Sequence, residues 1–131
     1  MVPQWKDVIV YAPVTDKPSL LDKLREVIDS LGSGESVEVC RTVKELGRRL
    51  RQPRGRPGIV VLLAVSREDL LDLLSMASLL EDFRIVLVFP DREADTVTRE
   101  YSLRPRFLTF SDSSFGDIGA VLKKMRNGAQ L

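Results

Sequence analysis

The most apolar stretch of the chain covers residues 58–66, GIVVLLAVS, where polar and apolar positions do not alternate. A strand with this pattern must be covered on both faces, as the inner strands of parallel sheets are. Pro57 and Gly58 mark its start, and its Val and Ile content favours a strand over a buried helix. We therefore predict that this stretch is the central strand of a parallel sheet.

Four shorter runs predict the remaining strands, over residues 8–12, 37–40, 85–89 and 107–110. Apolar residues at helical spacing between and after these runs predict five helices, over residues 19–31, 42–51, 66–80, 91–101 and 114–126. Four of these helices begin with a capping-box pattern, in the pairs Ser19 and Asp22, Thr42 and Glu45, Ser66 and Asp69, and Ser114 and Asp117. In the 37–40 run apolar and polar residues alternate, which predicts a strand near the sheet edge.

Five alternations of strand and helix with short connections predict an α/β fold. Right-handed crossovers build such a chain into a five-stranded parallel sheet of order 2-1-3-4-5, with helices on both faces. The 131 residues are enough for one domain, residues 1–131, and we expect a single compact core.

The predicted helix over 66–80 has a wider apolar arc than a surface helix needs. Its residues Leu70, Leu73, Leu74, Ala77 and Leu80 suffice to cover one face of the sheet. The apolar residues left towards its flanks are Leu71, Met76 and Leu79. An exposed apolar patch favours association, and a symmetric dimer is the simplest closed arrangement that would cover it.

Composition excludes several kinds of chemistry. The chain has no histidine, which removes the commonest metal ligand and general base, and its one cysteine, Cys40, excludes a disulfide within the chain. We expect Cys40 to be buried and inert, and we expect no metal site and no cofactor. No apolar run is long enough to cross a bilayer and no signal peptide is visible, so we expect a cytoplasmic protein without a membrane partner.

The chain carries 20 basic and 19 acidic residues, so any electrostatic argument must be local. From Arg41 to Arg56 basic residues far outnumber acids, and most of them are arginines: Arg48, Arg49, Arg51, Arg54 and Arg56. This stretch lacks interleaved aromatic residues, so we interpret it as a solvated helix face and expect no nucleic-acid partner. Acids of the following helix, such as Glu68 and Asp72, could complement it.

Two stretches carry a family resemblance. Residues 56–63, RPGIVVLL, and residues 107–110, FLTF, resemble the strand-three and strand-five motifs of the receiver domain of bacterial two-component response regulators, which has a flavodoxin-like fold. The resemblance covers nearly the whole chain. It implies a role in signal transduction, and it implies that Phe107 is the switch aromatic. Receiver domains often pair through their fourth helix, which would place a dimer contact around Val97 and Tyr101.

In that family, acidic residues accept the phosphoryl group and hold the cation, and this chain has other residue types at the corresponding positions. The phosphoacceptor Asp corresponds to Leu63 or Ala64, depending on the register, and the paired acids that hold Mg²⁺ correspond to Ala12 and Pro13. Phosphoryl transfer to a carboxylate needs that carboxylate as the nucleophile and a cation held by acidic side chains. We therefore expect no phosphoryl transfer at these positions.

Two further positions of the family's site have changed. The strand-four Ser or Thr corresponds to Phe89 or Pro90, and the strand-five Lys corresponds to Phe110. Together with Leu63 and Val65, these aromatic residues would plug the pocket.

The sequence therefore resembles a degenerate pseudo-receiver: not an enzyme, but a signalling or regulatory module that acts through protein–protein contacts independently of phosphorylation. Two alternatives stay open. One is a nucleic-acid-binding regulator that uses the stretch from Arg41 to Arg56. The other is a sensor of a small ligand or nucleotide at the carboxyl ends of the strands.

Overall fold

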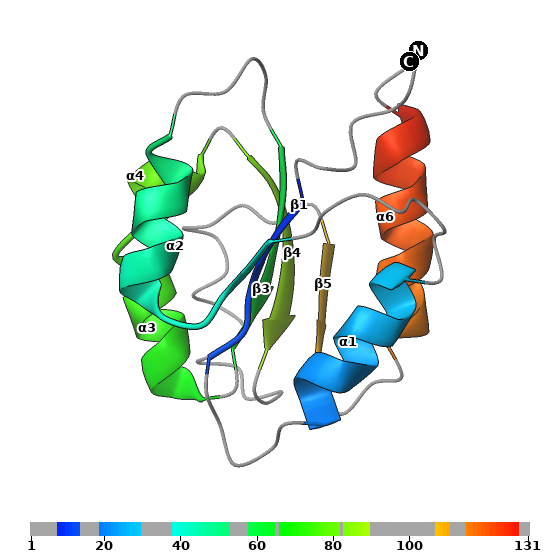
Figure 1. Ribbon diagram of the computed structural model, residues 1–131, viewed down its shortest axis with the longest axis horizontal. Coiled ribbons are helices and arrows are strands. Elements are labelled where there is room, and N and C mark those ends of the chain that lie inside the picture. The colour runs from blue at the N-terminus through cyan, green and yellow to red at the C-terminus, as the bar shows by residue number, and fades with distance from the viewer. Residues whose placement is uncertain are drawn as a thin grey trace.

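A five-stranded sheet runs through the centre of the protein, in a computed structural model that describes residues 8–13, 19–29, 38–52, 58–64, 66–81, 83–89, 107–110 and 115–128 (Figure 1). Its strands are β1 Val8–Tyr11, β2 Glu38–Cys40, β3 Ile59–Leu63, β4 Arg84–Phe89 and β5 Phe107–Phe110. All neighbouring strands are parallel, and their order is β2-β1-β3-β4-β5. The predicted fold class and strand order are therefore confirmed.

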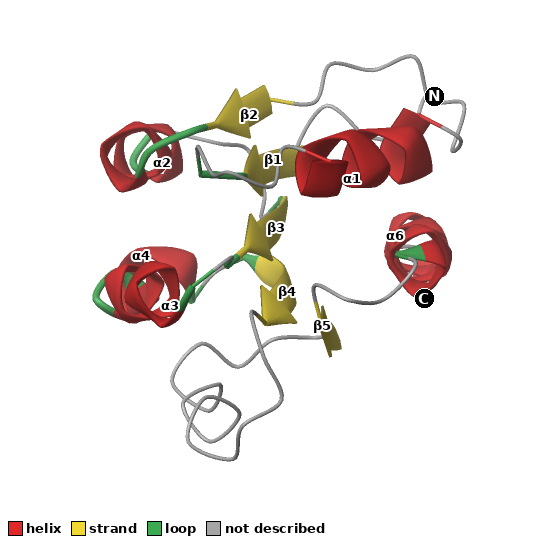
Figure 2. Ribbon diagram, turned by 90° about the horizontal axis from the view of Figure 1, so that it is seen from below, coloured by secondary structure: helices red, strands yellow, loops and turns green. Residues whose placement is uncertain are grey.

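Helices cover both faces of the sheet. They are α1 Ser19–Asp29, α2 Val43–Leu50, α3 Arg67–Leu74, α4 Ala77–Leu80 and α6 Gly116–Gly128. Figure 2 shows α1 and α6 on one face and α2, α3 and α4 on the other. The helix predicted over 91–101, which includes Val97 and Tyr101, lies outside the described residues.

Alternate residues of each strand enter different cores. Val10, Val61 and Val88 pack with α1 and α6, whereas the residues beside them, such as Val60 and Leu87, pack with α2, α3 and α4. Every residue of β3 is buried, which confirms that the uninterrupted apolar run is a strand covered on both faces.

Side-chain caps fix where α2 and α3 begin. The Thr42 hydroxyl accepts a hydrogen bond from the Glu45 N–H at 3.1 Å, and the Glu45 carboxylate accepts one from the Arg41 N–H at 2.9 Å. The Ser66 hydroxyl accepts one from the Asp69 N–H at 3.2 Å. The Thr42 and Ser66 hydroxyls thus satisfy amides that lack a partner in the first helical turn, as the sequence predicted, whereas the bond to the Glu45 carboxylate comes from the residue before the N-cap.

The single helix predicted over 66–80 is wrong, because the chain turns at Ser75 and Met76 between α3 and α4. The Ser75 hydroxyl donates to the Asp72 carbonyl at 2.6 Å, and the Met76 N–H donates to the Leu73 carbonyl at 3.0 Å, three residues back. Such bonds compete with the regular helical pattern. As a result, Met76 is buried in the core beneath α2 rather than lying on a flank, so its predicted place at an interface is also wrong.

Candidate functional site

The carboxyl ends of the strands lie at one edge of the sheet because all five strands are parallel. In open α/β sheets this edge is where ligands bind. The described residues there are Ala12 and Pro13 after β1, Leu63 and Ala64 at the end of β3, and the two aromatic residues Phe89 and Phe110, which end β4 and β5.

The backbone at this edge is already hydrogen-bonded within the sheet. The Ala12 N–H donates to the Cys40 carbonyl at 2.9 Å, and the Ala64 N–H donates to the Val88 carbonyl at 3.0 Å. The ladder thus continues one residue beyond β1 and β3. These two amides cannot also hold an anion at the strand ends.

The positions that correspond to the acidic residues of a receiver domain are apolar and buried. Ala12 and Ala64 are fully buried, Leu63 is 1% exposed, and Pro13 is buried as well. None of their side chains offers an oxygen ligand or a nucleophile. The residues present therefore do not fit a Mg²⁺ ion or a phosphoacceptor at these positions.

Phe89 and Phe110 meet at the ends of β4 and β5. Their ring centroids are 5.8 Å apart and the ring planes are inclined by 72°, an edge-to-face arrangement. Both pack on the side of α2, α3 and α4, whereas Leu63 packs on the side of α1 and α6. The prediction of a single plug is wrong, because neighbouring strand residues fill opposite faces of the sheet. Val65 and Pro90 lie outside the described residues.

Phe107, the predicted switch aromatic, lies at the start of β5 opposite Val86. It is half-buried and packs against the core of α1 and α6. Phe107 and Phe110 therefore lie at opposite ends of a strand and on opposite faces of the sheet.

Tyr11 is a residue at this edge that the sequence analysis did not single out. Its side chain is 2% exposed on the side of α2 and α3. Burial first, and then the carboxylates of Asp69 and Asp72, raises the pKa of Tyr11 to about 12. The hydroxyl therefore keeps its proton to a more alkaline pH than an ordinary tyrosine does. The sequence signal was a tyrosine at the last position of an apolar strand.

Cys40 is buried at the end of β2, as predicted. Burial and, to a smaller extent, the Glu45 carboxylate raise the pKa of the Cys40 thiol, while Arg48 acts in the opposite direction. Because the thiolate is the reactive form, this environment makes Cys40 a poor nucleophile.

The basic stretch is divided by the helix into two groups. Lys44, Arg48 and Arg51 are exposed and follow one another at helical spacing, so they form one stripe along α2, which we call the basic stripe. Arg49 lies beside it and pairs with the Glu38 carboxylate and the Gln52 side chain. Arg54 and Arg56 lie outside the described residues.

The three apolar residues predicted at the flanks of the third helix have different surroundings. Leu71 on α3 is 47% exposed and is the one large apolar side chain classed as exposed in the described part of the chain. Leu79 is half-buried against the core, and Met76 is buried. Of these three residues, Leu71 thus offers the largest apolar contact to a partner.

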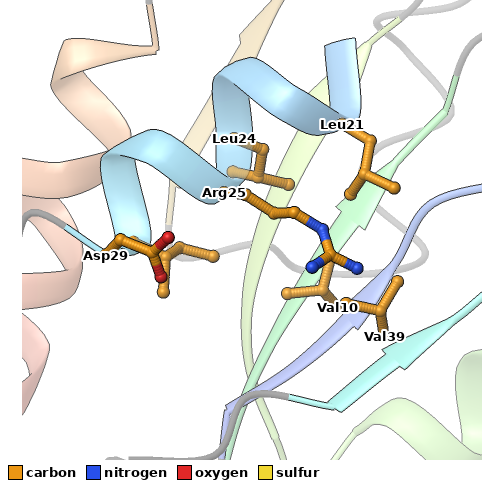
Figure 3. Close-up of a pocket in the computed structure, with 7 residues that line it drawn as sticks. Val10, Leu21, Leu24, Arg25, Asp29 and Val39 are labelled. Atoms are coloured by element: carbon orange, nitrogen blue, oxygen red, sulfur yellow. The ribbon is translucent and has the colours of Figure 1, made fainter. Parts of the chain in front are cut away.

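A small cavity lies away from the strand ends, between α1 and the strands β1 and β2 (Figure 3). Its volume is about 140 Å³, and its lining combines apolar side chains such as Val10, Leu24 and Val39 with Arg25 and Asp29. In Figure 3 the Arg25 guanidinium extends from α1 over Val10 and Val39. This cavity therefore does not coincide with the carboxyl ends of the strands, where the sensor alternative would place its ligand.

Within the described residues, no three His, Cys, Asp or Glu side chains are grouped so that they could hold a metal ion, and no helix has the length and apolar content to cross a membrane. Comparisons of the chain with protein-family models, with curated proteins and with solved structures gave no match.

Proposed function

We propose that this chain is a non-catalytic regulatory domain that acts through protein–protein contacts and is controlled without phosphorylation. The carboxyl edge of its sheet carries this proposal. In a parallel α/β sheet this edge is the usual place for chemistry. Here Ala12, Leu63 and Ala64 are buried and apolar, two of the amides are used within the sheet, and an aromatic pair covers the neighbouring strand ends.

Each of these features counts against phosphoryl transfer for a separate reason. A buried aliphatic side chain cannot attack phosphorus, and alanine and proline cannot hold the cation that neutralises the developing charge. The Tyr11 hydroxyl at this edge is protonated at neutral pH, as an ordinary tyrosine also is, and its raised pKa makes the phenolate still less accessible. The resemblance to receiver domains supports a signalling role, and the changed residues support one without the phosphoryl switch.

The direct test is incubation with acetyl phosphate, and separately with beryllofluoride, each with Mg²⁺. We expect no change in the intact mass and no shift of the thermal midpoint, while a phosphorylatable receiver domain treated in parallel shows both. A stoichiometric acyl phosphate on this chain would contradict the proposal.

Protein contact is tested by affinity capture from a native lysate under two conditions, one with a chelator and one with Mg²⁺ and acetyl phosphate. We expect the same partner in both. A partner that binds only under the second condition would show that control still depends on phosphorylation.

The two alternatives have less support in the structure. A nucleic-acid site on the basic stripe would bring phosphates close to the acids of α3, on the same side of the sheet, where Glu68 and Asp72 are exposed. We expect only weak, nonspecific binding to oligonucleotides, falling steeply with salt.

A nucleotide at the strand ends would have to displace buried apolar side chains, so we expect no thermal stabilisation by nucleotides.

A further inference from the structure

The side of the protein formed by α2, α3 and α4 carries two stripes of opposite charge. The basic stripe runs along α2. On α3, Glu68, Leu71 and Asp72 are exposed and lie three and four residues apart, so they form a second stripe, which we call the acidic stripe. Leu71 places an apolar side chain, 47% exposed, between two carboxylates.

The two helices are held in a fixed relation to each other. α3 and α4 are joined by the turn at Ser75 and Met76, and the Met76 side chain reaches beneath α2, where its Cε lies 3.3 Å from the position a Cβ on Gly47 would occupy. Figures 1 and 2 both show α2 beside α3 and α4 on one side of the sheet. The exposed sides of these helices, with both stripes, therefore lie over the same face of the sheet.

We propose that this surface binds a second copy of the chain in a symmetric dimer, in which the basic stripe of each copy meets the acidic stripe of the other. A two-fold axis brings the same surface of both copies together, so a surface with two patches of opposite sign is complementary to itself. Both contacts form at once, and each Leu71 side chain, which lies within the acidic stripe, faces the basic stripe of the other copy.

The stripes favour a second copy over other occupants. Nucleic acid complements the basic stripe but is repelled by the acidic one, and it offers nothing to Leu71. The chain itself supplies the acidic, leucine-bearing partner that the basic stripe requires. Charges arranged in this way mainly determine partner choice and orientation, while the exposed leucine adds apolar contact.

Charge reversal tests the pairing directly. One variant carries Lys44→Glu, Arg48→Glu and Arg51→Glu, and a second carries Glu68→Lys and Asp72→Lys. In a self-pair of either variant, both contacts join like charges. We expect each variant to dissociate at least about tenfold more readily than the wild type, as measured by sedimentation equilibrium.

Mixing the two variants gives the decisive result. In a mixed dimer, the reversed basic stripe of one copy meets the reversed acidic stripe of the other, and the two unreversed stripes also meet. We expect native mass spectrometry of the equimolar mixture to show the mixed dimer in excess over either self-pair. A change in the folding or stability of one variant by itself cannot produce an excess of the mixed dimer.

Three controls accompany the mixing. Lys123→Glu with Lys124→Glu reverses two exposed charges on α6, on the opposite side of the sheet, and should leave dimerisation unchanged. Leu71→Ser should weaken the dimer while the monomer stays folded, because the side chain is 47% exposed in the single chain. High salt should weaken the wild-type dimer, since exposed charges are screened.

Several outcomes would overturn the proposal. If the wild-type chain is monomeric at every soluble concentration, the proposed dimer does not form. The same holds if that monomer binds an oligonucleotide through the basic stripe. A dimer that both reversed variants retain places the interface elsewhere, for example around Val97 and Tyr101. Folded variants that fail to form the mixed dimer show that the two stripes do not meet. None of these outcomes bears on the phosphorylation test.

Discussion

Phe89 and Phe110 pack edge to face, with ring centroids 5.8 Å apart, where β4 and β5 end. The two residues are register partners in the parallel ladder, so the sheet itself brings their rings together. Phe89 is fully buried, whereas Phe110 is partly exposed. The contact therefore joins the interior of the core to the surface at the edge where a related fold would bind its ligand.

This contact should be measurable as a coupling between two substitutions. We expect Phe89→Ala to lower the free energy of unfolding by about 3–5 kcal/mol, because it empties a fully buried site, and Phe110→Ala to cost less. In a double-mutant cycle with Phe89→Leu and Phe110→Leu, the coupling should be about 0.5–1.5 kcal/mol. Urea unfolding measures all four proteins, and a coupling near zero would show that the rings contribute only by burial.

The sheet could be predicted from the sequence because its signals are local and strong. The run over 58–66 contains no polar residue that would need solvent until Ser66, so it had to be an inner strand. The alternation of strands and helices with right-handed crossovers then gave a parallel sheet, and the strand order expected for it was that of flavodoxin-like sheets. The apolar residues at the carboxyl edge could be predicted as well, because the end of each predicted strand identifies the residue that lies there.

The break between α3 and α4 could not be predicted in the same way. Leu70, Leu73, Leu74, Ala77 and Leu80 continue the helical period across it, and no Gly or Pro marks it. The turn depends on the hydroxyl of Ser75, a residue that helices tolerate, and on the space beneath α2 that Met76 fills.

The surroundings of Tyr11 could not be predicted either, because they depend on carboxylates that lie more than fifty residues away in the chain.

Tyr11 should make stability depend on pH in the alkaline range. Its pKa is about 12 in the folded protein against 10.0 ordinarily, so the folded state binds the phenolic proton more tightly than the unfolded chain does. This contribution to stability is complete below pH 10 and is lost as the pH rises towards 12. We expect the free energy of unfolding to fall over this range, and to fall less in Tyr11→Phe.

The chain has two tyrosines, so each can be titrated alone. In Tyr101→Phe, the ultraviolet absorbance of tyrosinate reports Tyr11, and its midpoint should lie near 12. Asp72→Asn in that background should lower the midpoint only part of the way, because burial is the larger cause of the shift. An unshifted midpoint near 10 in the folded protein would contradict the burial of this hydroxyl.

Lys23 on α1 lies over the ring of Phe115, at the start of α6, with its Nζ 4.4 Å from the ring centroid. Phe115 has a positive φ of 68°, a conformation that bulky residues rarely adopt, and its ring is 1% exposed. Lys23→Gln should lower the free energy of unfolding by about 0.5–1 kcal/mol, whereas Lys23→Arg should retain most of the stability, because a guanidinium also binds an aromatic face. Thermal and urea unfolding of the two variants measure the difference, and equal losses would exclude the cation–π contact.

Two glycines inside helices should respond in opposite directions to substitution by alanine. Alanine favours a helix over glycine by about 0.5–1 kcal/mol, so the surroundings of the added methyl group decide the sign. At Gly47 that group would lie 3.2 Å from Nη1 of Arg51 and 3.3 Å from Cε of Met76, both at the ends of flexible side chains. We expect Gly47→Ala to raise the free energy of unfolding.

At Gly119 on α6, the added methyl group would lie 3.0 Å from Cγ1 of Val27 on α1. A β-branched side chain is stiff, and overpacking typically costs about 1–3 kcal/mol, which exceeds the gain in helix propensity. Gly119→Ala should therefore destabilise the protein, as measured by urea unfolding. In a Val27→Ala background the close contact is absent, so the same substitution should stabilise by about 0.5–1 kcal/mol. If Gly119→Ala destabilises equally in both backgrounds, the crowding does not come from Val27, and the packing of α1 on α6 differs from the arrangement described.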